Sequence, residues 1–131
     1  DFAADTDNQP MAVAILDNLK KLDLALLPID AQEIWMDHGP DLMAAAKNFA
    51  EAKELEARRK LLEPLTQALV PILDPFGYSR EGGAVGIFHC PMALDDVGAD
   101  WLQEEATTAN PYYGSGMLRC GSRTKILELG N

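Results

Sequence analysis

The stretch that decides the fold is residues 51–73, which read EAKELEARRKLLEPLTQALVPIL. Its large aliphatic residues recur at three- and four-residue steps, the spacing of one apolar stripe along a helix. The sequence therefore predicts a long amphipathic helix, kinked at Pro64 and Pro71 because proline removes a backbone hydrogen bond. The stripe consists of Leu55, Leu61, Leu62, Leu65, Leu69 and Ile72.

The residues before this helix have the same texture, rich in alanine and leucine and almost free of glycine. A first helix is expected to begin near Pro10 and to end by Pro28. Asp30 followed by Glu33 has the form of a capping box, so a second helix is expected to begin at Ala31. It is expected to break at residues 38–40, which read HGP, and to resume over 41–50. Residues 8–78 thus predict an up-and-down helical bundle.

Residues 79–131 differ from the bundle, because glycine becomes frequent and the charged amphipathic pattern ends. The short apolar run 84–89 predicts a strand, and residues 124–129 predict a second strand paired with it. A short helical turn is expected around Trp101-Leu102, and residues 110–114, which read NPYYG, contain turn residues. We therefore expect one mainly α-helical domain over residues 1–131, in which a Gly/Pro-rich region with one or two short β-strands follows the bundle.

Composition excludes several classes of function. Lys and Arg number 11 against 21 Asp and Glu, a net charge of −10. Such an acidic chain is a poor partner for nucleic acid or anionic lipid. Its apolar runs fall well short of the roughly 20 residues that a membrane-spanning helix needs. We expect neither a nucleic-acid binder nor a membrane span.

The C-terminal region places each of its two cysteines close to a methionine, in CPM at 90–92 and MLRC at 117–120. Thiolate and thioether sulfur together suit soft Cu(I), whereas Zn(II) rarely takes thioether and Ca(II) or Mg(II) prefers oxygen. In an extended segment the two sulfur atoms of the first motif lie on one side, and a helical turn does the same for the second. The pattern predicts one Cu(I) site formed by Cys90, Met92, Met117 and Cys120.

Residues near these sulfur atoms are candidates for supporting roles. His89 precedes Cys90, so in a strand its side chain points to the opposite face. It is either a metal ligand where the backbone turns, a residue that contacts the ligands, or an ordinary surface residue. Trp101, Tyr112 and Tyr113 are expected to cover the site and exclude water, or else to form the small core of this region.

The same residues permit other interpretations. A disulfide between Cys90 and Cys120 would close a loop of about 30 residues and stabilise the fold by roughly 3–4 kcal/mol. Zinc held by both cysteines, His89 and a carboxylate of Asp95 or Asp96 is a less favoured metal site. A nucleophilic Cys90 activated by His89 is disfavoured, because adjacent strand residues point apart and no third residue is evident to orient the histidine. We therefore expect no enzyme.

The C-terminal motifs follow one another in the order HCPM (89–92), WL (101–102), NPYYG (110–114), ML (117–118) and CG (120–121). This series resembles a bacterial family of domains of unknown function, found alone in the periplasm or attached to CusB/HlyD-type adaptor subunits of heavy-metal efflux systems. The resemblance extends upstream into the long helix, through Arg59, Leu62, Leu65 and Leu69, and so covers about residues 10–121.

The resemblance implies an exported helical domain with a copper-associated Cys-Pro-Met…Met-x-x-Cys centre, matched here by Cys90, Met92, Met117 and Cys120. We therefore expect a periplasmic Cu(I) carrier, chaperone or sequestration protein that exchanges copper with a transfer or efflux partner. Oxidation of the two cysteines to a disulfide would release the metal. The alternative is a disulfide-stabilised helical interaction module of a heavy-metal efflux system, with no metal of its own.

Overall fold

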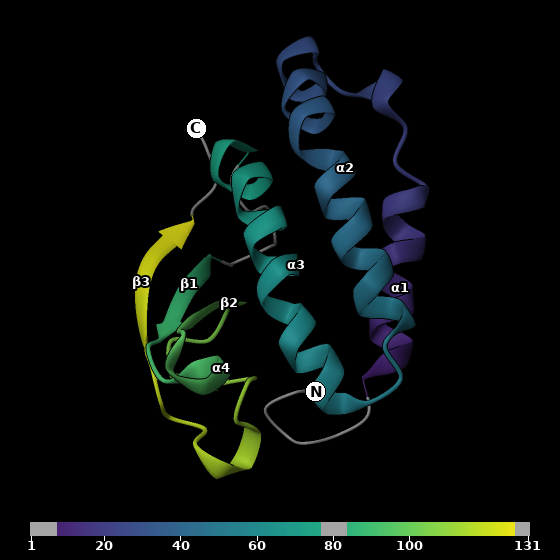
Figure 1. The fold of residues 1–131 in the computed structure, drawn as a ribbon. Coiled ribbons are helices and arrows are strands. Elements are labelled where there is room, and N and C mark those ends of the chain that lie inside the picture. Colours follow the sequence, from purple (N-terminus) through teal and green to yellow (C-terminus); the bar gives the residue numbers. More distant parts are fainter. Residues whose placement is uncertain (1–7, 77–83, 128–131) are drawn as a thin grey trace.

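The computed structural model describes residues 8–76 and 84–127. In chain order its elements are α1 (Gln9–Lys20), the short 3-10 helix η1 (Leu24–Leu26), α2 (Ile29–Glu51), α3 (Leu55–Phe76), β1 (Val85–Cys90), α4 (Ala93–Asp96), β2 (Ala99–Gln103), the 3-10 helix η2 (Gly114–Gly116) and β3 (Ser122–Leu127). The long helices lie side by side, and α3 stands between α1 and α2 on one side and the sheet on the other (Figure 1). The protein is mainly helical, as predicted, with a small antiparallel sheet near its C-terminus.

The helices pack through the apolar stripe that the sequence predicts on α3. Leu65 and Ile72 of this stripe are buried against Leu42 and Phe49 of α2 and Ala12 of α1. Burying one large aliphatic or aromatic side chain contributes roughly 1.5–3 kcal/mol, so this cluster stabilises the helical part. None of the helices in the described ranges is both long and apolar enough to cross a bilayer.

The second helix corrects one expectation from the sequence. α2 continues without a break through Gly39 and Pro40, where the HGP run predicts an interruption. Gly39 is buried, and a Cβ atom at this position would lie 2.7 Å from the ring of Trp35, one turn earlier. The glycine therefore makes room for the indole on the helix surface, and tertiary packing outweighs its tendency to end a helix.

The starts of the second and third helices also differ from the predictions. α1 ends at Lys20, before Pro28 as expected, but α2 begins at Ile29 with no side-chain cap. The predicted capping box is therefore wrong, although the Asp30 carboxylate does accept a hydrogen bond from the backbone N–H of Ala31 at 3.0 Å. α3 begins at Leu55, four residues later than expected, and continues through three prolines, Pro64, Pro71 and Pro75.

The sheet contains three strands in the order β2-β1-β3, and both strand pairs are antiparallel. The two predicted strands are β1 and β3, and they pair as expected. The helical turn predicted around Trp101-Leu102 is wrong, because both residues lie in β2, where Trp101 pairs with Phe88 of β1. Along β2 the buried residues alternate, with Trp101 and Gln103 buried on one face and Leu102 half-buried on the other.

Candidate metal centre

The two cysteines meet at one end of the sheet. Cys90 is the last residue of β1, and Cys120 lies just before β3 begins. Figure 1 shows this end of β1 beside α4 and the start of β3. The Sγ atoms are 2.7 Å apart, and both residues are free thiols. The structure therefore brings together two of the predicted ligands, which are 30 positions apart in the chain.

Gly121 explains why the chain can pass so close to Cys90. Its φ angle is +112°, in the region that favours glycine. A Cβ atom here would lie 2.8 Å from both the His89 carbonyl oxygen and the Trp101 ring, and 3.3 Å from the Cys90 Cβ atom. Only a residue without a side chain fits, so the Cys-Gly pair at 120–121 allows the two thiols to approach each other.

Asn110 holds the backbone of Cys120 in place, a role that the sequence analysis did not assign to it. This residue is fully buried, and its Nδ2 donates to the carbonyl oxygen of Cys120 at 2.9 Å. Its Oδ1 accepts from the backbone N–H groups of Tyr112 at 2.8 Å and Tyr113 at 3.3 Å. The signal was present in the sequence, since asparagine before proline often bonds to its own backbone two residues later.

The long helix α3 holds this loop against the bundle. Arg59 is buried, and its Nε donates to the carbonyl oxygen of Pro111 at 3.0 Å. Its Nη1 also pairs with Glu56 at 2.5 Å. Arg59 belongs to the upstream part of the family resemblance, and the structure shows that it joins the helical part to the NPYYG run.

The three aromatic residues predicted to cover the site lie close to it. Trp101 stacks on Phe88 with ring centroids 5.5 Å apart, and Tyr112 meets the Trp101 ring edge-on at 6.2 Å. Phe88, Trp101 and Tyr112 belong to the same buried cluster as Cys90. Tyr113 is half-buried beside this cluster, and its hydroxyl donates to the carbonyl oxygen of Met92. These rings form an apolar surrounding for the buried thiol.

The two predicted methionine ligands lie in the turns next to the cysteines. Met92 is 46 % exposed and Met117 is 38 % exposed. Met92 has φ −93° and ψ −8°, so the chain turns directly after β1 and the predicted extended Cys-Pro-Met geometry is wrong. At the second motif the N–H of Cys120 donates to the Met117 carbonyl oxygen at 3.1 Å, which closes one turn as predicted.

His89 lies on the opposite face of β1 from Cys90, as strand geometry predicts. Its Nδ1 is 2.6 Å from the Oδ1 of Asp100, the residue of β2 that pairs with His89 across the two strands. The backbone N–H of Asp100 in turn donates to Glu63 Oε2 of α3 at 2.7 Å. Among the residues that the structure describes, no three His, Cys, Asp or Glu side chains are grouped as a metal site.

Burial and neighbouring groups raise two pKa values at the thiol pair. The pKa of Cys120 is raised first by the hydrogen bond between the two thiols, then by burial and by the charge of Cys90. The pKa of Tyr113 is raised by burial and by the negative charges of Cys90, Asp96, Cys120 and Asp95. Two thiolates this close repel each other strongly, and a bound metal cation would remove that repulsion.

Comparison with known proteins places the helical part in a family. Residues 4–81 match the family described as Protein of unknown function (DUF3347). The chain belongs to this family. The DUF3347 match ends before β1 and therefore leaves the thiol pair outside. No curated protein and no solved structure matches the chain.

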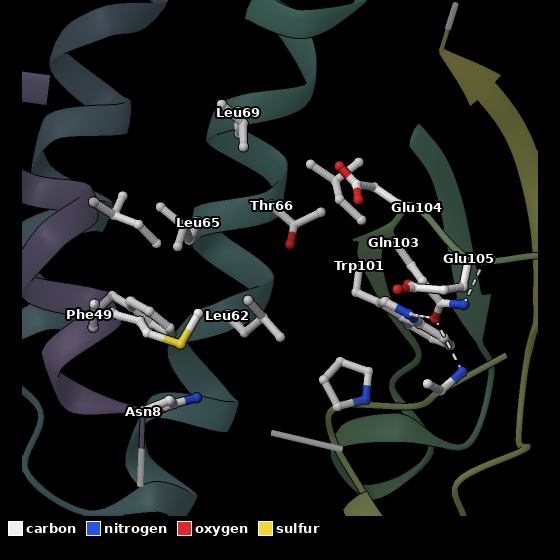
Figure 2. Close-up of a pocket in the computed structure, with 16 residues that line it drawn as sticks. Asn8, Phe49, Leu62, Leu65, Thr66, Leu69, Trp101, Gln103, Glu104 and Glu105 are labelled. Atoms are coloured by element: carbon white, nitrogen blue, oxygen red, sulfur yellow. Dashed lines mark hydrogen bonds between the residues drawn. The ribbon is translucent and has the colours of Figure 1, made fainter. Parts of the chain in front are cut away.

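The DUF3347 helices also form one wall of an apolar cavity of about 580 Å³. Figure 2 shows Leu62 and Thr66 on the side of α3 that faces Trp101 and Gln103 of β2, whereas Leu65 lies on the side of α1 and α2. Trp101 also packs close to Gly121 and shares a buried cluster with Cys90. The indole therefore stands between the cavity and the thiol pair.

Proposed function

We propose that this DUF3347 protein binds one Cu(I) ion at Cys90 and Cys120 and acts as an exported copper carrier, chaperone or sequestration protein. The supporting observation is the pair of free thiols with sulfur atoms 2.7 Å apart, one of them buried among aromatic rings. The sulfur atoms would have to move apart to admit an ion between them, because a metal–thiolate bond is itself about 2.3 Å long, as for zinc. Binding and release of copper need no turnover reaction, so we propose no enzymatic activity.

The proposed ligand set adds thioether sulfur to the two thiolates. Met92 and Met117 lie within one turn of their cysteines, and both are exposed enough to rearrange around an ion. His89 is the weakest candidate because its ring is held by Asp100 on the other face of β1. Zinc prefers four nitrogen, sulfur or oxygen ligands, and in the described ranges no third such group joins the thiols. Cu(I) remains the better match.

We further propose that oxidation gates the site. Formation of a Cys90–Cys120 disulfide removes two electrons and two protons from the thiols, which an exported thiol–disulfide oxidant would accept. The product has no thiolate, so it would release copper. Reduction by a dithiol would restore both ligands. The closeness of the sulfur atoms supports this reaction, because little movement is needed to form the bond.

The periplasmic location and the link to CusB/HlyD-type efflux adaptors are proposed from the resemblance of the C-terminal motifs. The copper motif lies in the part of the chain beyond the DUF3347 match. A second candidate is a helical interaction module of an efflux system, stabilised by a disulfide and without metal. The same short distance between the two sulfur atoms favours this candidate.

The deciding experiment titrates fully reduced protein with Cu(I) against a competing chelator and counts bound ions by native mass spectrometry. We expect one tightly bound copper, which the Cys90→Ser/Cys120→Ser variant loses. Met92→Leu/Met117→Leu should weaken binding, whereas the control Met11→Leu/Met36→Leu changes two exposed methionines of the helical part and should not. No copper binding, with a mass two protons lower before reduction, would instead identify the disulfide-stabilised module.

A further inference from the structure

The two thiols of the pair differ in exposure. Cys90 is 0 % exposed, at the end of the central strand and packed against Ala93 and Trp101. Cys120 is partly exposed, because it lies in the loop that leads into β3. An ion held between them would therefore have a buried side at Cys90 and an open side at Cys120.

Exposed apolar residues lie in the turns next to the two thiols. Met92 and Met117 lie in the turns that carry the two thiols, and Val97 of the turn after α4 is 81 % exposed. We call these three residues, with Asp95 and Asp96, the exchange face. Large apolar side chains that are exposed near a reactive group are typical of a surface that contacts a partner.

The exchange face also has a fixed negative charge. Asp95 and Asp96 are exposed and have φ angles of +57° and +66°, in a left-handed turn closed by the hydrogen bond from Gly98 N–H to the Ala93 carbonyl at 2.9 Å. A Cβ atom at Gly98, which closes this turn, would lie 3.7 Å from the carbonyl oxygen of Cys90. The turn that carries the two carboxylates therefore packs against the end of β1 that carries the buried thiol.

One cation, Arg119, lies next to Cys120 in the chain. Arg119 precedes Cys120, but its Nη1 donates to the Thr108 carbonyl oxygen at 2.5 Å. Its guanidinium is thus directed to the loop after β2. The chain as a whole has a net charge of −10. The exchange face should therefore attract a positively charged molecule more than a negatively charged one.

We propose that copper enters and leaves through Cys120, and that the exchange partner presents a soft sulfur ligand on a positively charged surface that meets Asp95 and Asp96. This route rests on the copper site proposed above. A thiolate or thioether of the partner bonds to Cu(I), the Cys120–copper bond breaks, and the Cys120 thiolate takes a proton from water. Cys90 holds the ion until a second partner ligand replaces it. No electron is transferred.

The first test needs no metal. Reduced protein is treated with three maleimides of equal size that carry a cationic, neutral or anionic group, and the labelled cysteine is identified by peptide mapping. We expect Cys120 to react at least about tenfold faster than Cys90. Relative to their rates with N-acetylcysteine, the cationic reagent should react at least about threefold faster than the anionic one, and added salt should reduce this ratio.

Matched variants test the origin of the charge preference. Asp95→Asn/Asp96→Asn should abolish it, and asparagine tolerates the left-handed backbone of these positions. The control Asp17→Asn/Asp41→Asn removes two exposed carboxylates from α1 and α2 and should preserve it. Equal labelling of both thiols, or faster labelling of Cys90, would overturn the entry at Cys120. A preference unchanged in Asp95→Asn/Asp96→Asn would overturn the charged partner.

The second test uses the copper-loaded protein. Stopped-flow transfer of Cu(I) to cysteamine, 2-mercaptoethanol and 3-mercaptopropionate should be fastest for the cationic thiol and slowest for the anionic one. The Asp95→Asn/Asp96→Asn variant should give nearly equal rates. If no copper binds, the proposed function fails, while the labelling test still decides which thiol meets an incoming soft reagent and which charge is attracted.

Discussion

The helical part and the sheet region are held together by different interactions. In the helical part, the core consists of apolar side chains from three long helices, such as Leu42 and Leu65. In the sheet region, loops around a small aromatic cluster are fixed by buried polar side chains, above all Asn110 and Gln103. Substitutions in the first part should therefore change global stability, whereas those in the second should change the geometry of the thiol pair.

The largest effect is expected in the helical core. Leu42 is 1 % exposed, and Leu42→Ala should lower the free energy of unfolding by about 2–5 kcal/mol, because it removes buried methyl groups and leaves a cavity. Leu26→Ala, in exposed η1, should change it by less than about 0.5 kcal/mol. Urea unfolding followed by circular dichroism measures both. Equal losses in the two variants would contradict a stabilising core in this position.

Asn110→Ala should have the next largest effect, and it should separate stability from site geometry. The substitution leaves the carbonyl of Cys120 and two backbone N–H groups without their partner, at a cost of about 2–3 kcal/mol. Because Cys120 is then no longer held beside Cys90, disulfide formation in a redox buffer should shift toward the dithiol. Leu42→Ala, measured below its unfolding transition, should leave that redox equilibrium unchanged.

The same contrast decides how much the sequence could predict. Helices have a long repeat, so the stripe on α3 and the helical class are visible in the spacing of leucines. β2 is short, and its alternation is too brief to distinguish from a turn, so Trp101-Leu102 was assigned wrongly. The helix break expected at Gly39 is outweighed by packing, as the contact of Gly39 with Trp35 shows.

The pairing of the two cysteines was predictable from the sequence, but the geometry around them was not. Two cysteines with neighbouring methionines predict a soft-metal site, which stays a prediction, and the structure places the two thiols together. The spacing alone does not reveal that the chain turns at Met92 or that Gly121 must lack a side chain. These features depend on contacts between segments far apart in the sequence, which local patterns do not contain.

Two glycine substitutions test whether local backbone geometry sets the thiol separation, and their expected effect on stability is smaller than that of Asn110→Ala. Gly121→Ala forces a side chain into contact with Trp101 at a positive φ, so it should cost about 1–3 kcal/mol and separate the thiols. Gly116→Ala lies where no heavy atom is within 4 Å and should be nearly neutral. Chemical denaturation gives the stabilities, and the rate of disulfide formation reports the thiol separation. Similar rates in both variants would show that Gly121 does not set that separation.

The smallest expected effect is a dependence of stability on pH in the reduced, metal-free protein. The pKa of Cys120 is raised in the folded state, first by its hydrogen bond with Cys90, so the folded state favours the protonated thiol. This contribution is complete below the thiol pKa of the unfolded chain, about 8.5, and is lost as the pH rises through the higher folded value. The urea midpoint should therefore fall as the pH rises beyond about 8.5.

Cys120→Ser should flatten this fall, because serine does not ionise in that range. Tyr112 supplies the control: burial, followed by the charge of Glu63, raises its pKa far above the usual tyrosine value of about 10. Its contribution is therefore lost only at a more alkaline pH, and Tyr112→Phe should leave the slope between about pH 8 and 9.5 unchanged. A slope that follows Tyr112 and not Cys120 would mean that the proton shared by the thiols does not contribute to stability. Copper should reverse the sign for the thiols, since binding displaces their protons and strengthens as the pH rises.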